Sequence, residues 1–105
     1  MPNKNAIRGK NLERLLVNKA KEKGFKAIRA WGSNGKALGM DETVDLLIED
    51  IRIQAKKRKK IADYLSITEH YDVVAVQQDR QEAMIIMPFN MFLEFLAFRK
   101  KVNEM

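Results

Sequence analysis

The chain has 105 residues, the length of one ordinary domain, and its 46% hydrophobic and 32% charged residues are typical of a folded globular protein rather than a disordered one. Lysine and arginine number 20 against 14 acidic residues, and the net charge of +6 favours a polyanionic partner such as nucleic acid, with a basic protein that has no specific partner as the alternative. The sequence has no cysteine, which excludes disulfide frameworks and cysteine-based zinc sites.

No part of the sequence is typical of a secreted or membrane-spanning protein. Residues 1–14 are polar and basic and contain no apolar signal core, so we expect a cytoplasmic protein. The most apolar stretch, 83–98, contains Pro88, Asn90 and Glu94 and falls short of the ~20 apolar residues that a membrane span needs. We therefore expect no membrane partner and interpret this stretch as a buried strand followed by a helix.

The chain begins with a predicted arm and helix. Residues 1–8 are interpreted as a flexible basic arm, and residues 9–105 as a single domain. A helix is predicted over 9–23, because apolar residues recur there at helical spacing and Gly24 follows as a stop signal. The apolar face of this helix is expected to consist of Leu12, Leu15, Leu16 and Ala20.

A strand, a loop and a hairpin are predicted next. Apolar and polar residues alternate over 25–30, which indicates a strand, and the glycines within 31–42 indicate a loop. Two further apolar segments, 43–49 and 51–56, are joined by the polar pair Glu49-Asp50. Short apolar strands on either side of such a turn predict a β-hairpin.

The last part of the chain predicts a short irregular helix within 57–70, strands over 72–76 and 83–87, and a final helix opened by Pro88. The inward face of this helix is expected to carry Phe89, Phe92, Leu93 and Leu96, with Phe95 beside them. Apolar residues occupy more than one of its faces, so part of it is expected to form a subunit interface. The order of elements predicts an α/β fold in which helices flank a central mixed β-sheet.

Three polar residues of the predicted hairpin are expected to meet at one end of an otherwise apolar sheet. Gln54 and Lys56 share a face because strand residues alternate, and a two-residue turn brings Asp45 near the cross-strand register of Gln54. Phosphodiester hydrolysis needs such a cluster. A carboxylate binds a hard cation, the cation activates water, and a lysine holds that water and the anionic transition state.

The same residues carry a resemblance to a known family. The segments VDLLI at 44–48 and IQAK at 53–56 resemble the D…(E/Q)XK core of the PD-(D/E)XK nucleases. Upstream, GKNLER at 9–14, KGF at 23–25 and GSNG at 32–35 resemble the first helix, the following strand and the active-site loop of archaeal and phage-type Holliday junction resolvases. The resemblance covers about half of the chain, and the ordered set of motifs is much more specific than the D…QXK pattern alone.

This resemblance implies a restriction-endonuclease-like fold and a metal-dependent endonuclease. Glu13 and Ser33 would join the active site of Asp45, Gln54 and Lys56. The cation, Mg²⁺ or Mn²⁺, would be held by Asp45, Gln54, the backbone carbonyl of Ala55 and, directly or through water, Glu13. The DNA substrate would be a four-way junction cut by a homodimer, because paired cuts need two symmetric sites. A nuclease for nicks, flaps or mismatches is the nearest alternative.

The sequence departs from the family pattern at two positions. Val44 stands where proline is usual, and Gln54 where glutamate is most common. An amide oxygen can bind Mg²⁺ but brings no charge, so Glu13 or the loop acids Asp41 and Glu42 would have to compensate. A non-catalytic nucleic-acid-binding domain with a degenerate nuclease fold is therefore the alternative function.

The candidate residues also have purely structural interpretations. Glu13 would be a solvated helix charge, Asp45 a salt-bridge partner of Lys56, and Ser33 a turn former. A basic run at 56–60 is predicted to line the path of the DNA backbone, with a solvated charge run as the alternative. The predicted DNA-binding residues are Arg8, Lys10, Arg14, Arg29, Lys57, Arg58, Lys59 and Lys60.

Overall fold

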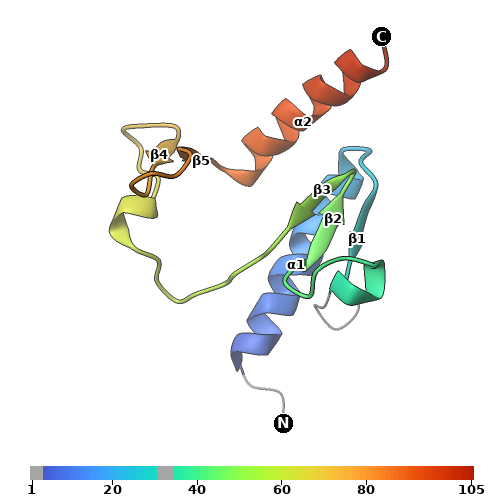
Figure 1. Ribbon diagram of the computed structural model, residues 1–105, viewed down its shortest axis with the longest axis horizontal. Helices are drawn as coiled ribbons and strands as arrows, with labels where there is room; N and C mark the ends of the chain where they lie inside the picture. Colours follow the sequence, from blue (N-terminus) through green and yellow to red (C-terminus); the bar gives the residue numbers. More distant parts are fainter. Residues whose placement is uncertain (1–3, 31–34) are drawn as a thin grey trace. The chain divides into compact units, whose positions relative to one another are not determined.

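The computed structural model describes residues 4–30 and 35–105, apart from the side chains of residues 5, 6 and 37, and it divides into two compact units (Figure 1). The first unit ends at Arg58 and holds α1 (Lys4–Glu22), β1 (Ala27–Arg29), the 3₁₀ turn η2 (Gly35–Leu38), β2 (Leu46–Ile48) and β3 (Ile51–Ile53). The second unit begins at Lys59 and holds η3 (Asp63–Leu65), β4 (Val74–Val76), β5 (Met84–Ile86) and α2 (Phe89–Asn103). The α/β class is confirmed.

Helix α1 begins earlier than predicted and ends as predicted. It starts at Lys4, so residues 4–8 belong to the helix and not to a flexible arm. Only a single glycine, Gly9, interrupts its first turns, at a cost of about 1 kcal/mol that the packing of a long helix offsets. At the other end, the Gly24 N–H donates to the Lys21 carbonyl and the Phe25 N–H to the Ala20 carbonyl. Gly24 has a φ of +87°, the left-handed conformation that this helix ending requires.

The inward face of α1 is rotated from the predicted one. Its buried residues are Glu13, Val17 and Ala20, whereas Leu15, predicted to face the core, is 50% exposed. Positions 13, 17 and 20 also repeat at helical spacing. Periodicity alone therefore allowed either of two neighbouring faces of α1 to point toward the core. The core selected the one that brings Glu13 toward the sheet.

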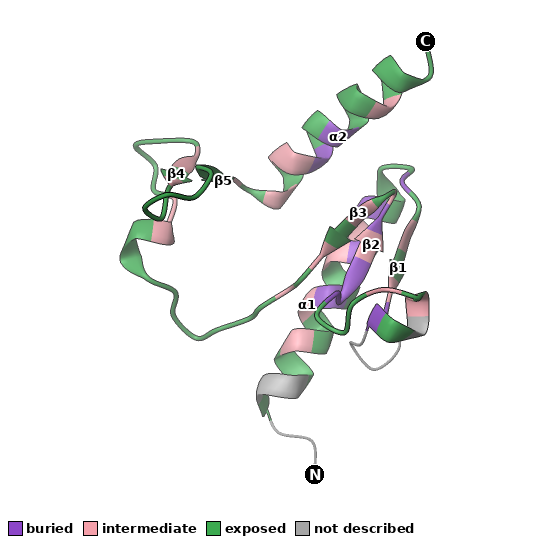
Figure 2. Cartoon of the chain, viewed as in Figure 1, coloured by how far each residue is buried: buried purple, intermediate pink, exposed green. Residues whose placement is uncertain are grey.

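The first unit is a three-stranded antiparallel sheet with α1 against one face. Strand β2 lies in the middle, and its Leu46 and Ile48 are fully buried (Figure 2). The register joins Arg29 to Leu46 and Leu46 to Ile53, so these three residues share a face of the sheet. Leu47 pairs with Ile28 and Arg52 on the opposite, less buried face.

The hairpin and its turn are confirmed, but the expected mixed sheet is wrong for the described residues. Ile48 pairs with Ile51, which leaves Glu49 and Asp50 as a two-residue turn. All described strand pairs are antiparallel, and they form two separate sheets, β1-β2-β3 and β4-β5. Parallel pairing needs a long crossover connection, and each described strand here pairs with its neighbour along the chain.

In the second unit, the predicted strands are confirmed and the predicted helix within 57–70 is reduced to the single turn η3. A helix this short is unstable without extensive packing, and none of the residues of η3 is buried. Helix α2 starts directly after Pro88, as predicted, and buries Leu93 and Leu96. Phe95, expected beside the inward face, is 61% exposed. Neither described helix is long and apolar enough to cross a membrane.

The turn η2 fixes the chain that leads into β2, and Gly35 is the residue that permits this. A Cβ atom at Gly35 would clash with the backbone carbonyl of Asp41 and lie 2.8 Å from the Cβ of Val44. We expect Gly35→Ala to lower the free energy of unfolding by about 1–3 kcal/mol, because backbone must move to admit the methyl group. Urea denaturation at constant m-value measures this change.

The matched control for Gly35→Ala is Gly9→Ala. An added Cβ at Gly9, within α1, meets nothing within 4 Å. This substitution should stabilise the protein by about 0.5–1 kcal/mol through helix propensity. Equal effects at the two positions would contradict the close approach of residues 35, 41 and 44.

Candidate active site

Asp45 stands directly before β2 and is tied to both neighbouring strands through its backbone. Its carbonyl accepts a hydrogen bond from the Ala30 N–H at 2.8 Å, and its N–H donates to the Ile53 carbonyl at 2.9 Å. Continuing the register of β2 and β3 would place Asp45 opposite Gln54. Asp45 therefore lies across from the Ile53–Gln54 peptide, which confirms the predicted nearness in register.

Asp45 is 9% exposed, and its carboxylate is hydrogen-bonded to the backbone of the same hairpin. Its Oδ2 accepts a hydrogen bond from the Ala55 N–H at 2.7 Å. No ion pair joins Asp45 to Lys56, both of them described residues, so the salt-bridge interpretation is wrong for this structure. A hydrogen bond to a charged acceptor contributes about 1.5–3 kcal/mol, and here it keeps the segment that follows β3 beside Asp45.

Gln54 and Lys56 lie beyond the end of β3 and are exposed, on either side of the half-buried Ala55. The predicted strand over 51–56 is therefore shorter than expected, because β3 ends at Ile53. Beyond Ile53, the hydrogen bond from the Ala55 N–H to the Asp45 carboxylate holds the chain in place of strand pairing. The side chains of Gln54 and Lys56 are exposed, and they flank the residue whose backbone binds the buried carboxylate.

Glu13 is buried against the sheet and not solvated, so its interpretation as an ordinary surface charge is wrong. Only 4% of its side chain is exposed, and its Oε1 lies 3.5 Å from the Nε of Arg29 in β1. Arg29 pairs with Leu46, the residue that follows Asp45. Glu13 thus reaches the end of the sheet at which Asp45 stands.

The Glu13–Arg29 ion pair was not found by sequence reasoning, which assigned Arg29 to DNA. The signal was present in the alternation of β1, where Ala27 and Arg29 share the face toward α1 and Ile28 faces away. A charged side chain on a covered face is expected to pair with an opposite charge, and the covering helix can supply one. Glu13 is the acid that α1 buries.

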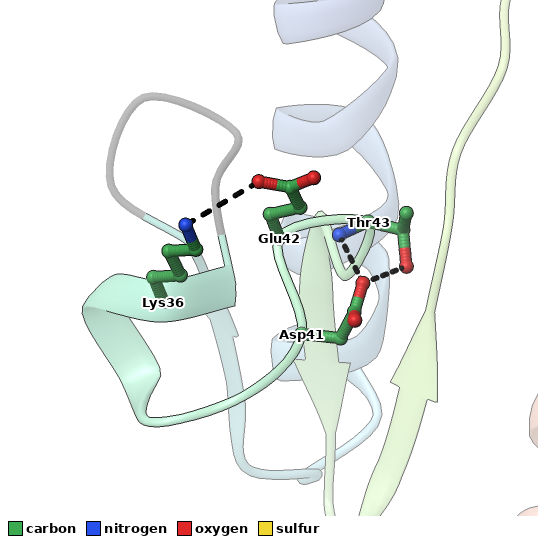
Figure 3. Close-up of polar contacts among 4 residues, drawn as sticks. All are labelled: Lys36, Asp41, Glu42 and Thr43. Atoms are coloured by element: carbon green, nitrogen blue, oxygen red, sulfur yellow. Dashed lines mark hydrogen bonds and ion pairs between the residues drawn. The ribbon is translucent and has the colours of Figure 1, made fainter.

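The acids of the loop before β2 are engaged locally (Figure 3). Asp41 Oδ1 accepts hydrogen bonds from the N–H and the hydroxyl of Thr43, at 2.9 and 2.7 Å. These bonds, first that from the backbone and then that from the side chain, lower the pKa of Asp41 below its usual value. Glu42 pairs with Lys36 at 3.5 Å, and both side chains are exposed. Neither acid is placed by these contacts to compensate for Gln54.

The predicted DNA-binding residues fall on several surfaces. Arg8, Lys10 and Arg14 are exposed on α1. Lys10 and Arg14 are four residues apart and share a face of the helix, whereas Arg8 is two residues from Lys10 and does not face it. Residues 57–60 are all exposed, with Lys60 3.9 Å from Asp63 and Arg58 donating to the Lys57 carbonyl. Ser33 and the rest of its predicted loop segment, 32–34, lie outside the described residues.

The donor set fits a hard divalent cation in kind, with one anionic oxygen fewer than the usual family pattern. Among the described residues, no group of three or more His, Cys, Asp or Glu side chains is placed to hold a metal ion. The oxygen donors that the resemblance predicts are instead two carboxylates, Glu13 and Asp45, together with the Gln54 amide and the Ala55 carbonyl, and the structure joins Asp45 to the Ala55 backbone. Mg²⁺ and Mn²⁺ accept carboxylate, amide and carbonyl oxygens.

Comparison with known families identifies the chain. Residues 4–94 match the family model described as archaeal Holliday junction resolvase (Hjc). The chain belongs to this family. The match begins at the first residue of α1 and ends within α2, so it includes all the described strands. Membership implies a nuclease of the resolvase kind, a class that acts on branched DNA in recombination and repair and generally needs a divalent metal. No curated protein and no solved structure was found to match the chain.

Proposed function

We propose that this resolvase-family chain is an active, metal-dependent endonuclease that cuts four-way DNA junctions by phosphodiester hydrolysis. The observation that carries the proposal is the hydrogen bond from the Ala55 N–H to Asp45, which ties the backbone between Gln54 and Lys56 to a buried carboxylate. A buried acid near a bound phosphate would weaken DNA binding unless a cation lay between them, and Asp45 therefore favours an enzyme over a plain binding domain. Membership in the resolvase family supports the junction as substrate.

Each residue of the site has a separate task in this proposal. Asp45, the Gln54 amide oxygen and the Ala55 carbonyl would hold Mg²⁺ or Mn²⁺, with Glu13 direct or through water. The cation, when bound, supplies an acidified water and neutralises charge on the phosphate. Lys56 orients the attacking water and stabilises the anionic transition state. Ser33 is proposed as a further polar contact to the reacting groups.

Replacing Asp45 by asparagine should abolish cleavage of a labelled four-way junction in Mg²⁺. Asparagine retains an oxygen that accepts from the Ala55 N–H, so the fold is kept while the anionic metal ligand is lost. Junction affinity should stay equal or rise, because a negative charge facing phosphate is removed. Cleavage is read on a denaturing gel, with linear duplex as the substrate control, and full cleavage by the variant would sink the site assignment.

The exposed basic run is proposed to follow the DNA backbone. Replacing residues 57–60 with alanine should weaken binding to all DNA sequences. It should also reduce the slope of log affinity against log salt by about 0.9 per lost phosphate contact on B-DNA. Lys60 already lies near Asp63 and is expected to contribute less than Lys59. Fluorescence anisotropy at several salt concentrations measures the slope.

A second fourfold alanine variant controls for the loss of positive charge. It removes four other exposed lysines, namely Lys21, Lys23, Lys26 and Lys101. Its salt slope should fall less than that of the 57–60 variant. Equal slopes for the two variants would mean that the basic run points to solvent without contacting DNA.

Gln54 is the position at which an active enzyme and a degenerate binder differ most. In an active site, Gln54→Glu should lower the Mg²⁺ concentration for half-maximal cleavage, because a hard dication prefers an anionic oxygen. Gln54→Ala should lose most activity, since Asp45 would be the only hairpin side chain left to hold the cation. Both substitutions fall on an exposed residue, which spares the fold. Cleavage rates over a magnesium titration measure both effects.

Two other outcomes at Gln54 decide against the proposal. An inert natural protein that gains cleavage with Gln54→Glu is a degenerate nuclease kept for binding. If neither substitution changes cleavage, the D…QXK match is coincidental and a plain nucleic-acid-binding domain is the better description.

We further propose that the enzyme acts as a homodimer through α2. Phe95, Phe98 and Val102 are 61%, 69% and 47% exposed and recur at helical spacing, apart from the buried Leu93 and Leu96. A continuous apolar stripe on a helix is typical of an interface. A two-fold dimer would present two sites to opposing strands of a four-way junction.

Phe98→Glu should convert the dimer to monomer, because it places a charge within the apolar stripe. Ala97→Glu, at an exposed position pointing away from the stripe, is the matched control and should remain dimeric. Light scattering after size exclusion measures the mass. A dimer that survives Phe98→Glu would place the interface elsewhere.

A further inference from the structure

Among the described residues, Arg29 Nε is the one buried side-chain polar atom without a hydrogen-bond partner. Arg29 Nε is buried and lies 3.5 Å from Glu13 Oε1, yet it has no hydrogen-bond partner. A quarter of the Arg29 side chain is nevertheless exposed. Besides this Nε, a guanidinium carries N–H donors on both Nη atoms, so Arg29 has the chemistry to bind a second anion in addition to Glu13.

The ion pair makes the net charge of the proposed metal site less negative. Glu13 and Asp45 carry the negative charges, Arg29 and Lys56 balance them, and Gln54 is neutral. A divalent cation that enters such a site finds no excess of negative charge and competes with Arg29 for the Glu13 carboxylate. A DNA phosphate at the site would supply the missing charge and offer Arg29 a bidentate partner.

We propose that Arg29 is a positioning residue that makes binding of the divalent cation depend on DNA: it occupies Glu13 in the free protein and turns to a DNA phosphate when cation and DNA are both bound. This inference rests on the proposed metal site and adds its regulation. The free protein then binds the cation weakly, and the cation and the DNA each strengthen the binding of the other by the same factor. Without DNA, the active site of the protein therefore holds no cation.

The test measures this coupling factor on the full chain without relying on activity. Affinity for a labelled four-way junction is determined by anisotropy with and without Ca²⁺, at fixed ionic strength and under conditions that give no cleavage. Asp45→Asn provides the background from calcium that binds only to DNA. Calorimetry gives the affinity of Ca²⁺ for the protein alone.

For the natural protein we expect Ca²⁺ to raise junction affinity at least about tenfold above the Asp45→Asn background. Arg29→Gln should bind Ca²⁺ more tightly without DNA and should lose most of the coupling factor. Arg29→Lys, which keeps the charge but not the bidentate geometry, should retain part of it. Lys26→Gln, which removes one exposed charge elsewhere, should retain all of it. A merely structural role for Arg29 would instead weaken calcium binding equally with and without DNA.

A coupling factor near one in the natural protein, or an unchanged factor in Arg29→Gln, overturns the inference. If circular dichroism shows that Arg29→Gln does not fold, Gln54→Glu replaces it, since the added charge must also raise calcium affinity in the free protein and lower the coupling. Cleavage of the junction in Mg²⁺ without coupling refutes the inference and leaves the proposed function standing. Absence of both metal binding and cleavage refutes both.

Discussion

The hydrogen bond from the Ala55 N–H to the Asp45 carboxylate is the contact on which the candidate site depends. It satisfies a buried charge and at the same time fixes the chain after β3 has ended. Without it, Gln54 and Lys56 would belong to an unpaired segment with no fixed position relative to the acid. The interaction thus links the stability of the hairpin to the geometry that catalysis would need. It also offsets the free-energy cost of burying the Asp45 carboxylate next to the sheet.

A second charged contact sets how the helix meets the sheet. Glu13 turns inward to Arg29, and α1 consequently buries Val17 and Ala20 while Leu15 faces outward. Buried ion pairs contribute little to stability once the cost of removing both charges from water is counted. Here the pair places a second buried carboxylate on a helix, toward the end of the sheet that carries Asp45, where the proposed cation site would use it.

Family membership and site chemistry answer different questions about this protein. The match over residues 4–94 establishes a Holliday junction resolvase family chain, and the motif order that suggested this family covered only about the first half. Gln54, which stands where the family usually has glutamate, removes one negative charge from the proposed site, and under the proposed function this lowers the affinity for a cation before DNA binds. The exposed stripe on α2 and the basic run at 56–60 are surface features, and the partners proposed for them are a second copy of the chain and the DNA backbone.

Most local features followed from the sequence alone. Gly24 ended α1, the Glu49-Asp50 pair made the hairpin turn, Pro88 opened α2, and the hairpin placed Asp45 near Gln54. These features depend on backbone preferences and on residues close in the chain, which a sequence displays directly. Only the tertiary structure decided which face of α1 turned inward, that Arg29 faces Glu13, and that Asp45 binds a backbone N–H instead of Lys56. In each case the local sequence allowed more than one arrangement. The packing of segments that are distant in sequence decided between them.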